Sequence, residues 1–151
     1  MNQAIELTAA RPVGPYPLWA THLGEAHLLA GRPEDAHQLA ERALARARDR
    51  KQQAYEAYAL RLYGEIAAQR TPLVVEPAAA YYRQAITLAE ELGMRPLQAH
   101  CHLGLGTLFT RAGRREQARA ALASAMALYR AMAMTFWLPH VQAALAQVEK
   151  P

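Results

Sequence analysis

One pattern of small and large residues occurs three times along the chain. It is clearest in residues 105–125, which contain Leu105, Gly106, Phe109, Gly113, Ala118, Leu122 and Ala125. The same offsets recur in Leu23, Gly24, His27, Gly31, Ala36, Ala40 and Ala43, and, with two extra residues, in Tyr63, Gly64, Ala78, Tyr82 and Ala85. Gly24, Gly64 and Gly106 lie 40 and 42 residues apart. Such a period predicts stacked copies of one structural unit.

The pattern resembles the tetratricopeptide consensus, in which each repeat is a helix-turn-helix unit. The resemblance implies an all-α fold: a right-handed tetratricopeptide-repeat superhelix of three helix pairs followed by a C-terminal capping helix. Composition agrees with helix, since 52% of the residues are hydrophobic, mostly alanine and leucine, and only 7% are aromatic. Antiparallel helices approach closely where side chains are small. We therefore expect three close pairs, Gly24 with Ala36, Gly64 with Ala78, and Gly106 with Ala118.

Periodicity and turn residues predict seven helices. The expected pairs are about 17–30 with 33–50, 52–69 with 76–92, and 96–111 with 114–132, and a last helix covers about 136–149. Gly31 and Gly93 are expected to end helices, and Pro33 to lie in a first turn. The predicted organisation is an N-terminal segment, 1–15, and a repeat domain, 16–151, with repeats at about 17–50, 57–92 and 99–132.

The two ends of the predicted stack differ. Trp137, Val141, Leu145 and Val148 form one stripe on the last helix, which we expect to cover the third repeat, with Trp137 largely buried. Only residues 1–10 are available to cover the face around Leu18, Trp19 and Leu23. Because an uncapped repeat end exposes an apolar surface, this face predicts a concentration-dependent homodimer through the N-terminal repeat.

Three segments of the chain closely resemble one family. They are residues 92–109 (LGMRPLQAHCHLGLGTLF), 112–119 (AGRREQAR) and 129–138 (YRAMAMTFWL). They resemble the C-terminal repeats of bacterial signalling proteins in which a class III adenylate or guanylate cyclase domain and a predicted ATPase domain precede the repeats. The resemblance covers about 60–147. The chain contains no G-x4-G-K-[ST] phosphate loop and nothing like the metal-binding aspartates of the cyclase, so the resemblance implies the repeat module alone.

The run His100-Cys101-His102 is the strongest candidate for a metal or nucleophile site. Neighbouring residues on a helix point about 100° apart, whereas chelation along a helix needs a spacing of three or four residues, which these side chains lack. We expect Cys101 to pack between helices and predict no metal, no cofactor and no catalytic residue. A single cysteine excludes an internal disulfide and is typical of a reducing compartment.

Arginine accounts for most of the net charge of +4. Two groups stand out: Arg42, Arg46 and Arg50, and Arg111, Arg114, Arg115 and Arg119. Acidic residues such as Glu41, Asp49 and Glu116 are interleaved with them, and neither group contains an aromatic platform. The pattern favours a salt-bridged, solvated face over a nucleic-acid site, and an acidic protein partner stays an alternative reading.

No membrane or export signal is predicted. Residues 131–148 carry no charge, but Thr135, Pro139, His140, Gln142 and Gln147 make this stretch too polar to span a membrane. Residues 1–10 carry Glu6 and no basic stretch before an apolar segment, so a secretory signal is not expected. We therefore predict a cytoplasmic location.

The first helix of each predicted pair is expected to line a concave groove. Its side chains are Leu18, Thr21, Glu25 and Leu28, then Tyr58, Arg61, Glu65 and Gln69, then His100, Leu103, Thr107 and Arg111. Arg61 and Arg111 are expected to receive carboxylates, and Tyr58 to act as an amphipathic anchor. The predicted function is a non-catalytic protein–protein interaction module, a scaffold or sensor that binds a protein or peptide in this groove. The alternative is a small-molecule or nucleic-acid-binding regulatory domain.

Overall fold

The computed structural model describes residues 16–150 of the chain, with side chains described from Ala20 onward. This part of the chain folds into seven α-helices without strands. They are α2 (Tyr16–Leu29), α3 (Pro33–Asp49), α4 (Gln53–Ala68), α5 (Val75–Leu92), α6 (Arg95–Arg111), α7 (Arg115–Ala131) and α8 (Leu138–Glu149). The predicted all-α class is confirmed, and each expected helix begins and ends within two residues of its predicted bounds.

Five of the six connections between these helices use one turn. A residue one or two positions after the helix end has a positive φ, at Gly31, Lys51, Gly93, Gly113 and Ala133. The next amide donates to the carbonyl five residues earlier, as Arg32 does to His27 at 2.8 Å and Met134 to Tyr129 at 2.9 Å. This is the Schellman ending, which satisfies carbonyls that a helix end leaves unpaired. Gly31 and Gly93 end helices as predicted, and Pro33 opens α3.

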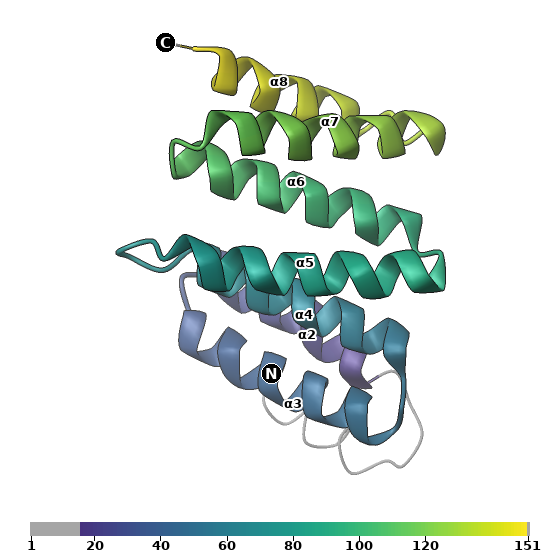
Figure 1. Cartoon of the computed structure of the whole chain (residues 1–151). Helices are drawn as coiled ribbons and strands as arrows, with labels where there is room; N and C mark the ends of the chain where they lie inside the picture. Colours follow the sequence, from purple (N-terminus) through teal and green to yellow (C-terminus); the bar gives the residue numbers. More distant parts are fainter. Residues whose placement is uncertain (1–15, 151) are drawn as a thin grey trace.

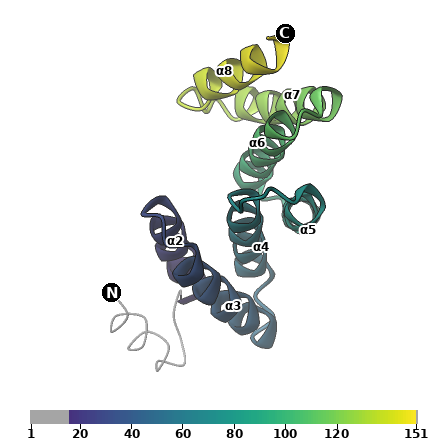
Figure 2. The ribbon, with the colours of Figure 1, turned by 90° about the vertical axis from the view of Figure 1, so that its left-hand side faces the viewer.

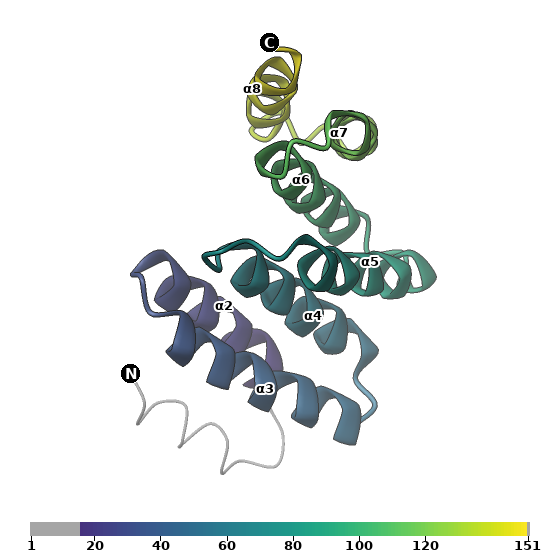
Figure 3. The same cartoon turned by 60° about the vertical axis from the view of Figure 1, so that its left-hand side comes forward.

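The helices form two layers (Figures 1 and 3). Along the stack α2 contacts α4, α4 contacts α6, and α6 contacts α8, whereas α3, α5 and α7 do not contact one another. A two-layer stack that is continuous in one layer and splayed in the other curves toward the continuous layer. We call α2, α4, α6 and α8 the inner layer, and α3, α5 and α7 the outer layer. Figure 2 shows the α2/α3 pair at one end of the stack and α7/α8 at the other.

The glycines of the repeat do create close approaches, but with partners other than those expected. A Cβ atom on Gly64 would lie 3.1 Å from the ring of Tyr82, and one on Gly106 would lie 2.4 Å from Leu122. At Gly24 the nearest atom belongs to Leu62 of the following pair, at 2.5 Å. The predicted pairing with Ala36, Ala78 and Ala118 is therefore wrong about the nearest neighbours. The space that a glycine leaves is filled by the large side chain one turn further along the partner helix, because a buried void is costly.

The first repeat departs from this scheme for a simple reason. Its residue equivalent to Tyr82 and Leu122 is Ala40, which is too short to reach Gly24. Leu62 of α4 fills that space instead and is fully buried. This contact joins α2 directly to α4 and ties the first helix pair to the second within the inner layer.

Helix α8 covers the last pair by packing on α7 and α6. Val141 and Val148 are buried, as the predicted stripe requires, while Leu145 is half-buried. Trp137 is also half-buried, less than expected, because it precedes the helix and leaves part of its ring on the inner surface. At the other end, Leu23 packs partly buried beside Ala20 and Leu39. The side chains of Leu18 and Trp19, and residues 1–15, lie outside the described part, so the N-terminal dimer stays a prediction.

A candidate binding surface on the inner layer

The twelve side chains expected in the groove divide into three groups. Thr21 and Leu28 are 1% and 5% exposed, so their prediction as partner-binding residues is wrong. The side chain of Leu18 lies outside the described residues. The remaining nine are exposed or half-buried: Glu25, Tyr58, Arg61, Glu65, Gln69, His100, Leu103, Thr107 and Arg111. Leu28 is buried because α2 packs against α4, where it joins Leu62 and Ile66 in a small core.

Three of these residues form an ionic cluster at the centre of the inner layer. Nε of Arg61 lies 2.9 Å from Oε1 of Glu65, and Nη1 lies 3.9 Å from Oε1 of Glu25. The Nε–H bond does not point at a carboxylate oxygen, so the contact with Glu65 is an ion pair rather than a hydrogen bond. Arg61 therefore bridges α2 and α4 by charge, with its hydrogen-bond donors incompletely used.

Burial changes the acid–base properties of this cluster. Burial raises the pKa of Glu65 to about 7, and the positive charge of Arg61 only partly opposes this rise. For Arg61, burial acts to lower the pKa, but the carboxylates of Glu65 and Glu25 outweigh it and raise the pKa. The cluster thus gains or loses a proton at Glu65 near neutral pH, while Arg61 stays charged.

Beside this cluster lies a group of rings that we call the aromatic corner, made up of His100, Tyr129, Phe136, Trp137 and His140. Nδ1 of His100 lies 2.6 Å from the hydroxyl of Tyr129. The ring centroid of Trp137 lies 4.7 Å from that of His100 and 6.0 Å from that of Tyr129. Phe136 contacts Trp137 and His140, and it is 71% exposed. The corner offers two exposed rings, those of Phe136 and His140, beside the half-buried rings of His100 and Trp137 and the buried ring of Tyr129.

His100 is neutral in this setting. Burial, with a smaller contribution from the charge of Arg61, lowers its pKa to about 4. In the tautomer in which the Tyr129 hydroxyl donates a hydrogen bond to Nδ1, the neutral imidazole of His100 carries its proton on Nε2. His100 can then donate one hydrogen bond to a ligand without bringing a charge.

A pocket of about 310 Å³ lies between α6 and α8, further along the inner layer. Its lining comes from Thr107, Thr110 and Arg111 of α6 and from Ala144 and Gln147 of α8. The two threonine hydroxyls donate to carbonyls of their own helix, Thr107 to Leu103 at 3.0 Å and Thr110 to Gly106 at 2.7 Å. Nη1 of Arg111 donates to the carbonyl oxygen of Ala68 at the end of α4.

Several residues that complete this surface were not expected there from the sequence. Trp137 was predicted as part of the cap, and Phe136, His140, Ala144 and Gln147 were not predicted to belong to the groove. Tyr129 is fully buried and supports these rings from below the surface. The spacing of His140, Ala144 and Gln147, four and then three residues apart within α8, is a sequence signal that places these three on the same side of a helix.

Two other arginines of the second basic group are paired with acids, as predicted for a salt-bridged face. Arg114 binds Glu76 at 2.7 Å. Arg119 binds Glu116 at 2.8 Å and Glu149 at 2.9 Å. Arg115 donates to the carbonyl of Lys150 at 2.7 Å. The ion pairs link the turn before α7 to α5 and link α7 to α8, and they neutralise the charges of Arg114 and Arg119.

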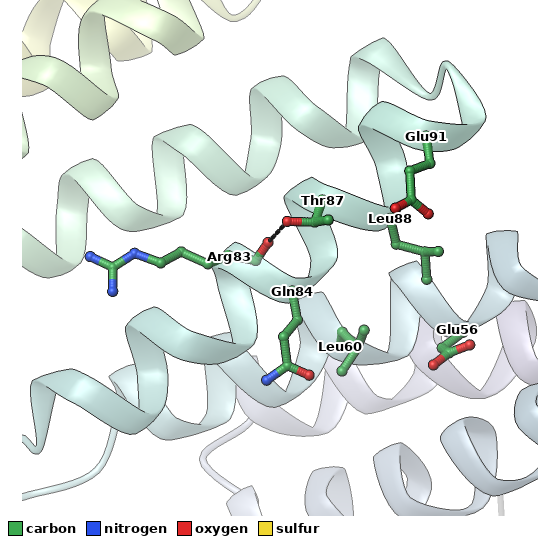
Figure 4. Close-up of a pocket in the computed structure, with 7 residues that line it drawn as sticks. All are labelled: Glu56, Leu60, Arg83, Gln84, Thr87, Leu88 and Glu91. Atoms are coloured by element: carbon green, nitrogen blue, oxygen red, sulfur yellow. Dashed lines mark hydrogen bonds between the residues drawn. The ribbon is translucent and has the colours of Figure 1, made fainter.

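A second pocket, of about 400 Å³, lies between α4 and α5 (Figure 4). Its lining residues are Glu56, Leu60, Arg83, Gln84, Thr87, Leu88 and Glu91. Two of its charged groups are occupied elsewhere, since Glu56 pairs with Arg48 at 3.0 Å and Arg83 lies over the ring of Phe109. In Figure 4 the Arg83 side chain points away from the other lining residues. This pocket is the weaker candidate for recognition.

No sign of metal or thiol chemistry appears in the described part of the chain. Within it, no group of three or more His, Cys, Asp and Glu residues is arranged to hold a metal ion. Cys101 is fully buried, as predicted, and burial raises the pKa of its thiol to about 12. Among residues 16–150, no helix combines the length and apolar character needed to cross a membrane.

Comparison with known proteins adds no family. No protein-family model matches the chain, and no curated protein matches it. The resemblance to the tetratricopeptide repeats of cyclase–ATPase signalling proteins therefore stays a prediction from the sequence.

Proposed function

We propose that this chain is a non-catalytic module that binds a protein or peptide segment along the inner helix layer. We also propose that its stack is a right-handed tetratricopeptide-type superhelix, and that it serves as a scaffold or sensor in a cytoplasmic bacterial signalling protein of the cyclase–ATPase kind. The family resemblance of residues 60–147 supports the second proposal, and the surface chemistry of the inner layer supports the first.

One observation carries the binding proposal. Arginine, histidine and tryptophan side chains from α4, α6 and the start of α8 come together around Arg61, His100 and Trp137. Arginine and aromatic residues dominate the energetics of protein interfaces. On the outer layer, some of the charged side chains are used in internal ion pairs, such as that of Arg48 with Glu56.

Selection from a random peptide library against the full chain tests this proposal. The affinity of a selected peptide is then measured for two variants that introduce the same residue on opposite sides. Thr107→Arg fills the inner surface, whereas Ala123→Arg is placed at an exposed site on α7. We expect Thr107→Arg, which changes both the shape and the charge of the inner surface, to change the affinity at least about tenfold, or ~1.4 kcal/mol, and Ala123→Arg to leave it unchanged.

Circular dichroism of both variants confirms that each one is folded. If no selected peptide responds to Thr107→Arg, or if Ala123→Arg is the more damaging change, the inner layer is not the binding surface.

A further inference from the structure

Arg111 lies on the inner layer, and no acidic side chain among residues 20–150 pairs with it. Arg61 has two carboxylates near it, whereas no ion pair joins Arg111 to an acid among residues 20–150. Arg111 is exposed, and its neighbours in the pocket are uncharged. Both arginines were expected to be carboxylate receptors, but of the two only Arg111 combines an unneutralised charge with an adjoining pocket.

The guanidinium of Arg111 is held in place over this pocket. Its bond to the carbonyl of Ala68 spans from α6 to the end of α4 and uses one of five N–H donors. The threonine hydroxyl protons are already donated within α6, so their oxygens can only accept further bonds. The site therefore offers hydrogen-bond donors from Arg111 and from the amide of Gln147, together with the positive charge of Arg111. These groups suit a ligand with an anionic oxygen.

The aromatic corner lies at the opposite end of α8 from the pocket. His140 belongs to the corner and Gln147 to the pocket, and their separation of seven positions corresponds to ~10 Å along a helix. An extended peptide covers that distance with about three residues. Phe136, which is 71% exposed, lies one turn further out, which lengthens the span to about five residues.

We propose that the segment bound by the inner layer carries an aspartate or glutamate side chain that pairs with Arg111 over the α6/α8 pocket, and a large apolar side chain three to five residues away that packs on the aromatic corner. This inference rests on the proposed function and names the chemistry of its partner. The carboxylate belongs to a side chain rather than to a chain end, because Arg111 is the exposed last residue of α6 and the main chain of the segment can continue past it.

The test uses a random library displayed so that the peptide has no free carboxyl end, which leaves acidic side chains as its carboxylates. Selected sequences are expected to combine an acidic residue with an aromatic or large aliphatic residue at this spacing. Arg111→Gln should weaken the binding of such a peptide about tenfold, and Arg111→Glu should shift selection toward lysine and arginine. Arg130→Gln, at an exposed arginine on α7, is the matched control and should change nothing.

A double-mutant cycle separates recognition from any loss of folding. Replacing the acidic residue of the peptide by its amide should lower the affinity about tenfold for the native chain and almost not at all for Arg111→Gln.

An equal loss of affinity with both proteins overturns the pairing. Peptides that respond to Thr107→Arg but show no acidic preference also overturn it, although the proposed function then stands. Synthetic peptides are also tested with a free and with an amidated carboxyl end. If they bind only with the free end, the carboxylate that pairs with Arg111 is a chain terminus and not a side chain, and the inference is overturned. If no peptide responds to Thr107→Arg, both proposals fail.

Discussion

Leu122 on α7 fills the space that Gly106 on α6 leaves open. A Cβ atom on residue 106 would lie 2.4 Å from Cδ2 and 2.5 Å from Cγ of Leu122, which is fully buried. The two helices of the third pair can approach this closely only because residue 106 has no side chain. The contact sets the distance between the layers at the point where the candidate surface lies.

Gly106→Ala is therefore expected to destabilise the protein by about 1–3 kcal/mol through overpacking. An alanine in a helix is otherwise more favourable than glycine by about 1 kcal/mol, so a loss would have to come from the contact. Leu122→Ala alone should cost about 2–5 kcal/mol, and the double variant less than the sum of the two. Urea unfolding measures all three. Additive losses, or a more stable Gly106→Ala, would show that Leu122 is not the neighbour that matters.

The repeated turn predicts opposite effects at two equivalent residues. Gly31 has φ 76° and no atom within 4 Å of the position that a Cβ would take, so Gly31→Ala should lose about 1 kcal/mol through backbone strain alone. Ala133 has φ 54° at the same point of the α7–α8 turn. Ala133→Gly relieves that strain and should be neutral or gain up to about 1 kcal/mol. Thermal unfolding of the pair provides the comparison, and a stabilising Gly31→Ala would contradict it.

Glu65 makes stability depend on pH in a defined direction. Its pKa is raised to about 7 in the fold, mainly by burial, so the folded state holds the proton more tightly than the unfolded chain does. The contribution of Glu65 to stability is complete below pH ~4.5 and is lost as the pH rises through about 7. The measured quantity is the free energy of unfolding of the native chain minus that of Glu65→Gln. This difference should fall by roughly 2–3 kcal/mol between pH 5 and pH 8.

Comparison with the Glu65→Gln variant removes the other titrating groups from the result. His100 acts in the opposite direction, since its pKa is lowered to about 4, but it is present in both proteins. Glu91→Gln, at an exposed carboxylate of α5, is the matched control for the removal of one carboxylate. A difference that does not change with pH for Glu65→Gln would mean that Glu65 ionises in the fold as it does in water.

Trp137 and Phe136 are expected to contribute unequally to the stability of the fold. Trp137 is half-buried and stacked parallel to Tyr129, so Trp137→Ala should cost about 2 kcal/mol, below the cost for a fully buried tryptophan. Phe136 is mostly exposed, and Phe136→Ala should cost less than about 0.5 kcal/mol. In a Trp19→Phe background, iodide should quench the fluorescence of Trp137 partially. Complete quenching would mean that Trp137 does not support α8.

Much of the fold follows from local features of the sequence. Helix positions could be predicted because hydrophobic periodicity and the turn residues Gly31, Pro33 and Gly93 act within a few residues of one another. Lys51 and Ala133 adopt the same turn without a glycine, and nothing in their side chains signals it. There the backbone conformation follows from the packing of the two helices that the turn connects.

The seven helices, their order and the small residues at which they approach could all be read from the amino-acid sequence. The three-dimensional packing was needed to show that Leu62 fills the space beside Gly24, that Thr21 and Leu28 are buried, and that Arg61 is paired while Arg111 is not. The physical reason is that periodicity defines which side of a helix faces the core, but not the rotation and tilt at which two helices meet. Those depend on how side chains from three or four helices fill one space together, and the candidate surface between α6 and α8 exists only at that level.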